Sequence, residues 1–209
     1  MRLDKTQGGV PGAVTTEEAD EQAIAEDVLR TSSMRYQEEL PGIDGDAIEA
    51  MLALLRTVRV HRTAVSRQLE SLDLAVGMTG ARYTLLMTLY FSRENLLAQN
   101  EISRELNVSR TNITNLIDGL ERDGLVERMP NPTDRRVSYA QLTERGRALC
   151  VKLMPTMAQL MEDATRDFSI EERAQFKAFL YRVQRNIVTA HPGHYSRGLG
   201  VDQEPQSLP

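Results

Sequence analysis

The sequence contains little of the residue types on which many catalytic and metal sites depend. Among its 209 residues there is one cysteine, Cys150, with three histidines and no tryptophan. A single cysteine cannot close a disulfide within the chain, and three scattered histidines lack the spacing of a structural zinc site. The sequence therefore predicts no metal ion and no cofactor.

Long hydrophobic runs are missing as well. No segment approaches the roughly 18 to 20 apolar residues that a transmembrane helix needs. The first residues, Met1 to Lys5, lack the apolar stretch of a secretory signal. These absences predict a cytoplasmic protein that does not bind membranes.

Motifs of the common enzyme classes are absent too. The sequence has no nucleophile elbow, no glycine-rich loop that could cradle phosphate and no metal-spaced set of His or Cys residues. We therefore expect a protein that is not an enzyme.

The net charge of −5 argues against a nucleic-acid partner until its distribution is considered. Residues 1–50 hold 4 basic and 12 acidic side chains, a balance of −8, which leaves the other 159 residues at +3. Residues 1–43 also offer too little apolar surface to fold alone. We expect an acidic, largely flexible extension with one possible docking helix from Thr15 to Leu29. The charge of the whole chain therefore says little about the surface that binds a partner.

Long amphipathic segments frame the rest of the chain. Apolar side chains recur at helical spacing over residues 46–72 and again over 143–190, where one helix is predicted through about Phe168 and another from Ile170 to Ile187. These helices exceed what a small domain needs to close its core, so we expect their apolar stripes to pack against a second copy of the chain. Residues 191–209 are expected to form a flexible tail.

The segment from Asn100 to Asp123 has the pattern of a helix-turn-helix. Asn107 suits the left-handed conformation of a tight turn, and the Ser109 side chain can cap the helix that follows. The second helix combines a buried stripe with small side chains whose hydrogen bonds and methyl groups suit the major groove of DNA. The stripe is predicted at Ile113, Leu116, Ile117 and Leu120, and the DNA-binding side at Ser109, Arg110, Thr111, Asn112, Thr114 and Asn115.

A hairpin with a charged tip is predicted directly after this helix. Leu125 to Arg128 and Val137 to Leu142 read as two strands, joined by a Pro- and Asn-rich connection that carries Asp134, Arg135 and Arg136. Such a wing can insert an arginine into the narrow, electronegative minor groove, while the aspartate orients a neighbouring guanidinium. The sequence thus predicts a winged helix over residues 74–142, in a fold that is mainly α with a small β component.

Four segments, taken in order, resemble the MarR family of winged-helix transcription regulators. They are Glu101 to Arg110, Leu120 to Val126, Asp134 to Arg136 and Leu142 to Gly146. The resemblance spans roughly residues 48–188 and implies a MarR-like domain at residues 44–190. It also implies an intertwined homodimer built from helices 46–72 and 143–190, which binds a pseudo-palindromic double-stranded operator, most often as a repressor.

The resemblance adds two expectations about the DNA contacts. Arg136 matches the arginine two residues after the family's wing aspartate, so it is the residue expected in the minor groove. Asn115 stands where many relatives carry arginine. We therefore expect weaker reading of guanine and a preference for half-sites that contain A·T pairs.

The resemblance also implies an effector site. Many relatives release DNA when a small aromatic or anionic compound binds between the dimer base and the winged helix. On the two helices where such a pocket would be sought, the candidates are His61, Arg62, Tyr83 and Met87.

Two other functions are compatible with the sequence. One is a redox-sensing regulator that uses Cys150, although a small buried apolar role suits this cysteine better because no neighbour in the sequence would stabilise its thiolate. The other is a winged helix that binds proteins and not DNA. A steep fall of DNA affinity with salt would separate a DNA-binding protein from such an adaptor.

Overall fold

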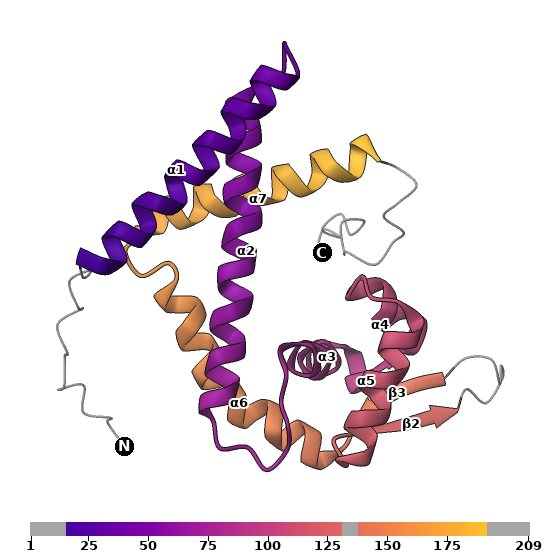
Figure 1. Ribbon diagram of the computed structural model, residues 1–209. Helices are drawn as coiled ribbons and strands as arrows, with labels where there is room; N and C mark the ends of the chain where they lie inside the picture. The colour runs from indigo at the N-terminus through magenta and orange to yellow at the C-terminus, as the bar shows by residue number, and fades with distance from the viewer. Residues whose placement is uncertain (1–15, 131–137, 192–209) are drawn as a thin grey trace, which may run out of the picture. The chain divides into compact units, whose positions relative to one another are not determined.

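The computed structural model describes residues 16–130 and 138–191 (Figure 1). It confirms a mainly helical protein with a small antiparallel sheet. The elements are α1 (Thr16–Glu39), α2 (Gly45–Ser71), α3 (Gly80–Phe91), the 3-10 turn η1 (Arg93–Asn95), β1 (Leu96–Ala98), α4 (Gln99–Glu105), α5 (Arg110–Arg122), β2 (Val126–Pro130), β3 (Ser138–Leu142), α6 (Glu144–Asp163) and α7 (Ile170–Ala190).

The chain divides into two compact units, residues 1–62 and 63–209. In the first unit, α1 packs against the beginning of α2. Ala25 and Ser33 are buried, and the Ser33 hydroxyl donates to the Glu49 carboxylate at 3.3 Å. This contact gives α1 the support that an isolated helix lacks.

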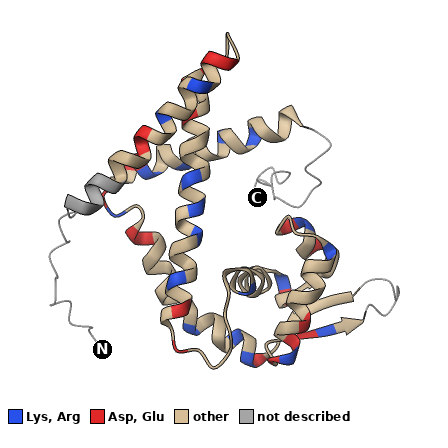
Figure 2. Ribbon diagram, viewed as in Figure 1, with Lys and Arg blue, Asp and Glu red and all other residues tan. Residues whose placement is uncertain are grey.

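Helix α1 occupies more of the N-terminal region than the sequence indicated. We expected a largely flexible stretch over residues 1–43 with a possible helix ending near Leu29, whereas α1 continues to Glu39. The contact at Ser33 lies beyond Leu29 and explains the difference, because packing on α2 stabilises turns that their own sequence does not. Acidic side chains are frequent on α1, whereas basic ones gather along the middle of α2 (Figure 2).

The second unit is built around α3, which contacts α5, α6 and β3. Figure 1 shows α3 nearly end-on, between α5 and α6. Full burial of one Leu or Ile side chain stabilises a fold by about 1.5 to 3 kcal/mol, so this cluster dominates the stability of the unit. Its fully buried members include Leu85, Leu86 and Leu89 of α3, Ile102 of α4, Ile113, Ile117 and Leu120 of α5, and Leu153 of α6.

The three strands form an antiparallel sheet in the order β1-β3-β2. Strand β3 is central: its Ala140 faces Leu97 of β1 on one side and Arg128 of β2 on the other. The predicted hairpin is confirmed, although β2 begins one residue later than expected and runs on to Pro130. Burial alternates at the end of β3, where Ala140 and Leu142 are buried and Gln141 between them is not.

Helix α6 begins in close contact with the residues that directly follow α5. The backbone N–H of Thr143 donates to the Leu125 carbonyl at 3.2 Å, and the Thr143 hydroxyl donates to the Gly124 carbonyl at 2.7 Å. One turn later, Gly146 is buried against the backbone of Leu125. A Cβ there would lie 3.0 Å from the Leu125 carbonyl carbon and closer still to its oxygen. Only glycine fits this crossing.

The two C-terminal helices meet at a short turn. Helix α6 ends at Asp163, several residues before the predicted Phe168. The reason is the start of the next helix, where the Ser169 hydroxyl accepts from the Glu172 amide at 3.1 Å and the Glu172 carboxylate accepts from the Ser169 amide at 2.7 Å. This capping box defines the beginning of α7 and leaves the preceding residues as a turn.

A pair of glycine substitutions tests the α5–α6 crossing. Gly146→Ala is expected to lower the free energy of unfolding by about 1 to 3 kcal/mol, because the added methyl overlaps backbone that cannot withdraw. Gly119→Ala, on α5, is the matched control, since its Cβ would meet nothing nearer than the Arg122 guanidinium at 4.0 Å. Helix propensity predicts that this variant gains up to about 1 kcal/mol. Urea denaturation of both variants measures the difference, and equal stabilities would contradict the crossing.

Candidate nucleic-acid interface

The turn between α4 and α5 fixes where α5 begins. Asn107 adopts the predicted left-handed conformation, with φ of 49°. The Ser103 hydroxyl donates to the Val108 carbonyl at 2.6 Å and closes the turn. Ser109 caps α5 as predicted, since its hydroxyl accepts from the Asn112 amide at 3.3 Å.

The buried stripe of α5 fixes which side of the helix faces out. Ile113, Ile117 and Leu120 are fully buried, and Leu116 packs at the edge of the same core. The six residues predicted to bind DNA therefore share an exposed surface at the beginning of the helix. They are Ser109, Arg110, Thr111, Asn112, Thr114 and Asn115.

One of these side chains is partly committed to the helix itself. The Thr114 hydroxyl donates to the Arg110 carbonyl at 3.0 Å. Its hydrogen is therefore engaged, whereas the oxygen can still accept and the methyl group is available for apolar contact.

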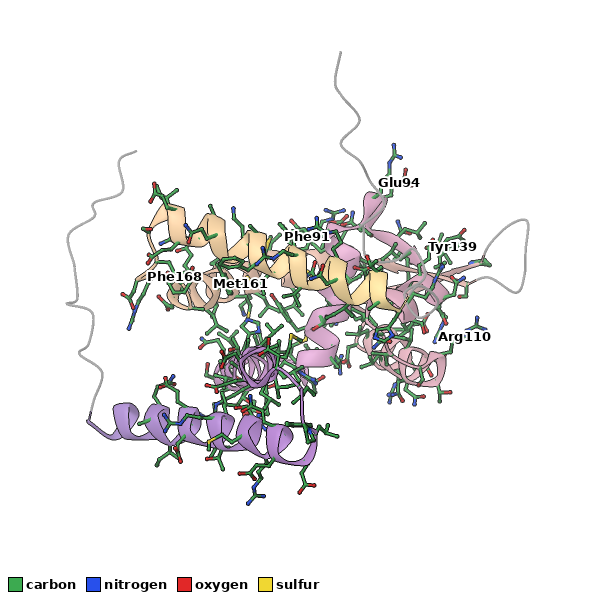
Figure 3. All side chains as sticks on the ribbon, turned by 90° about the horizontal axis from the view of Figure 1, so that it is seen from above. Phe91, Glu94, Arg110, Tyr139, Met161 and Phe168 are labelled. Atoms are coloured by element: carbon green, nitrogen blue, oxygen red, sulfur yellow. The ribbon has the colours of Figure 1, made fainter. Side chains whose placement is uncertain are left out.

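The predicted wing residues Asp134, Arg135 and Arg136 lie outside the described residues. The strands that lead to them, β2 and β3, are described, and Tyr139 stands at the start of β3. Figure 3 shows Tyr139 and Arg110 on the same side of the winged helix.

The acidic residues of α5 are paired, which sequence reasoning missed. Arg128 of β2 forms ion pairs with both Asp118 and Glu121. Burial would by itself lower the pKa of the Arg128 guanidinium, but the hydrogen bonds and charges of the two carboxylates outweigh burial and raise that pKa. Arg82 of α3 pairs in the same way with Asp123, the residue that ends α5.

A cavity of about 650 Å³ lies between α3, α4 and α6. Its wall includes two of the four predicted effector residues, Tyr83 and Met87. Phe91 and Met161, which Figure 3 labels, belong to the same wall. The other two candidates, His61 and Arg62, are exposed on α2 and are not part of this wall. Its ionisable residues, apart from tyrosine, are Glu101, Arg104 and Glu105.

Cys150 of α6 is fully buried, and its thiol lies 3.8 Å from the Leu86 carbonyl. Burial raises the pKa of the Cys150 thiol to about 11, despite the opposing charge of Arg147. Burial, with a smaller effect of Cys150, also raises the pKa of Tyr83. A thiol with a raised pKa and no exposure is a poor nucleophile, so the structure does not support a redox role for Cys150.

Two further expectations concern metals and membranes. Among residues 16–130 and 138–191, no three His, Cys, Asp or Glu side chains are grouped so that they could hold a metal ion. Within the same ranges, every helix is too short or too polar to cross a bilayer.

Comparison with known proteins identifies the family. A sequence model described as the MarR family matches residues 76–137. The HTH-type transcriptional regulator MhqR of Bacillus subtilis strain 168 is 31% identical over 115 residues, which cover 55% of this chain and 78% of MhqR. The chain belongs to the MarR family. It is therefore a transcription regulator, and the prediction that it is not an enzyme is confirmed.

Other relatives extend the match over more of this MarR-family chain. The HTH-type transcriptional repressor YetL of Bacillus subtilis strain 168 is 26% identical over 145 residues, or 69% of this chain and 84% of YetL. The crystal structure of the S. aureus MepR–DNA complex superposes with a TM-score of 0.57 at 25% identity and covers 64% of this chain and 96% of MepR. The winged-helix fold is confirmed by this likeness.

The burial of Cys150 predicts slow chemical modification. At pH 8, a thiol reagent such as iodoacetamide is expected to label the folded protein at least about tenfold more slowly than the urea-unfolded chain, because a pKa near 11 leaves little thiolate.

The raised pKa of the Cys150 thiol also predicts that the stability of the protein depends on pH. The unfolded chain loses its thiol proton first, so the contribution of Cys150 to stability is complete below pH 9 and falls as pH rises towards about 11. Rapid labelling of the folded state would contradict this environment.

Proposed function

We propose that this MarR-family regulator is a repressor that reads double-stranded DNA with the first turns of α5 in the major groove. The observation that carries the proposal is the exposed row of hydrogen-bonding side chains at the start of α5, held by a fully buried stripe on the opposite side. The name of YetL as a repressor and the crystallisation of MepR with DNA support it.

The chemistry of the exposed row fits base edges. Asn112 and Asn115 can each form two hydrogen bonds with adenine, and the methyl groups of Thr111 and Thr114 can contact thymine. Arg110, at the first position of α5, can reach either a phosphate or a guanine. This set favours operators with A·T pairs in each half-site.

The wing supplies a second contact in the proposal. Strands β2 and β3 lead into and out of the segment that carries Asp134, Arg135 and Arg136. In the proposed complex Arg136 enters the minor groove beside the α5 site, where a narrow groove concentrates negative potential. Asp134 orients a neighbouring guanidinium, and Arg135 is a further DNA-binding residue of the tip.

The working form of the protein in this proposal is a homodimer. Helix α7 buries none of its residues in the single chain, although Phe176, Phe179 and Tyr181 are large and apolar. On α2, Leu55 and Val58 are likewise exposed. Exposed apolar side chains on long helices often mark a surface that a partner covers. If the partner is a second copy, the dimer presents two α5 helices to a pseudo-palindromic operator.

A small effector completes the proposal. The cavity of about 650 Å³ is large enough for an aromatic compound, and Tyr83, Met87 and Phe91 give it an apolar wall. Two carboxylates, Glu101 and Glu105, oppose the single cation Arg104 there. The wall therefore supports an aromatic ligand more strongly than an anionic one.

Selection of bound sequences from randomised duplexes tests DNA reading. We expect an enriched palindrome with A·T pairs in both half-sites, bound with an affinity whose logarithm falls linearly with the logarithm of salt concentration, with a slope of about −0.9 per phosphate contacted. Absence of any enriched sequence would remove DNA reading and leave the winged helix as a protein-binding module. A G·C-rich consensus without adenine would remove only the assignment of Asn112 and Asn115.

A wing variant tests the second contact. Arg136→Ala is expected to weaken binding to the selected duplex by about tenfold or more, the usual effect of losing one well-placed arginine. The control is Arg166→Ala, in the turn between α6 and α7, where the arginine is exposed and pairs with its neighbour Asp167 at 3.6 Å. Equal affinities of the Arg136 and Arg166 variants would exclude the wing from the interface.

A ligand pair tests the effector cavity. Benzamide is expected to bind more tightly than benzoate in calorimetric titrations, because the carboxylates of the wall repel an anion. Met87→Trp should weaken binding of both compounds by narrowing the cavity while the DNA affinity stays within about twofold. Tighter binding of benzoate would reverse the charge preference, and unchanged binding to the Met87 variant would place the ligand elsewhere.

A further inference from the structure

Two carboxylates lie on the side of α5 that is proposed to face DNA. Asp118 follows Thr114 by four residues and Thr111 by seven, so the three side chains share one face of the helix. Glu121 lies one turn further along. Their side chains are 46% and 39% exposed, so neither carboxylate is removed from solvent by burial. Unscreened, both would repel the phosphates that line the groove.

Arg128 reaches both carboxylates from the neighbouring strand. One nitrogen of its guanidinium pairs with Asp118 and another with Glu121. The backbone N–H of Arg128 also donates to Glu121 at 3.2 Å, so that carboxylate is held from two directions. The planar fork of arginine is suited to bridging two acids in this way, whereas lysine offers a single point of charge.

The same contact joins the reading helix to the strand that leads to the wing. Arg128 lies two residues before Pro130, where β2 ends, and its backbone is paired with Ala140 of β3. The Arg128 side chain is only 30% exposed, and its guanidinium is paired with carboxylates of α5. Arg128 is thus placed to influence the DNA contacts that other residues of α5 make, and its guanidinium does not point to a groove.

We propose that Arg128 is a positioning residue for DNA reading, which screens Asp118 and Glu121 from the phosphates and ties the wing strand to α5. The inference rests on the proposed function. With Arg128 the three groups carry a net charge of −1, and without it they carry −2 beside the groove. The repulsion is electrostatic, so its effect is greatest at low salt.

Four variants separate screening from other roles of Arg128. They are Arg128→Gln, Arg128→Lys, the double variant Asp118→Asn with Glu121→Gln, and the triple variant that combines Arg128→Gln with the double. Affinity for the duplex selected by the wild-type protein is measured by fluorescence polarisation at about 50 and 200 mM salt. Thermal unfolding of each variant reports on the fold.

Screening predicts a distinct order of affinities. Arg128→Gln should bind about tenfold more weakly than wild type at low salt, and less than about threefold more weakly at high salt, because salt screens the exposed acids. The triple variant should regain affinity to within about threefold of the double variant. Arg128→Lys keeps the charge but loses the fork, so it should lie between wild type and Arg128→Gln.

Three results would overturn the inference. Wild-type affinity of the Arg128→Gln variant would show that Asp118 and Glu121 do not weaken DNA binding when Arg128 is removed. A triple variant as weak as Arg128→Gln would show that Arg128 acts directly on DNA or through stability. A loss of affinity in Arg128→Gln that does not depend on salt would exclude screening. Failure of the proposed function is separate, because in that case the wild-type protein itself selects no duplex.

Discussion

The structure depends above all on the burial of α3 against the inner side of α5. Leu85, Leu86 and Leu89 have no exposed surface, and the stripe of α5 that contains Ile113 and Ile117 is equally buried. A helix with one side held in this way cannot rotate about its axis without exposing apolar surface. The outward direction of its polar residues is therefore set by packing, and the cap at Ser109, the hairpin and the start of α6 all take their positions from it.

Charge in this protein is arranged locally, and sums over the chain hide the arrangement. From Glu101 to Arg147 there are eight arginines and eight acids. Three of those acids, Asp118, Glu121 and Asp123, form ion pairs with arginines. An acidic side chain on a nucleic-acid interface is therefore compatible with binding when a cation is supplied from an adjoining element, since the phosphates respond to the local field.

The features that the sequence predicted well were set by neighbouring residues. The left-handed Asn107, the cap at Ser109 and the strands of the hairpin each depend on a few adjacent positions. The extent of α1 and the end of α6 were predicted less accurately, because the first depends on tertiary packing and the second on the next helix. The ion pairs of Arg128 were not predicted, and of the cavity wall only Tyr83 and Met87 were, since both depend on which side chains meet across elements.

The joint between α5 and α6 has a mechanical consequence. Leu125 accepts the amide of Thr143, and Gly146 leaves no space between the two backbones. Because the two backbones are in direct contact, neither can shift at this crossing without the other, and α5 is mechanically coupled to α6. A change in the angle of α6 would therefore be passed to α5 and would move the residues that we propose to bind DNA.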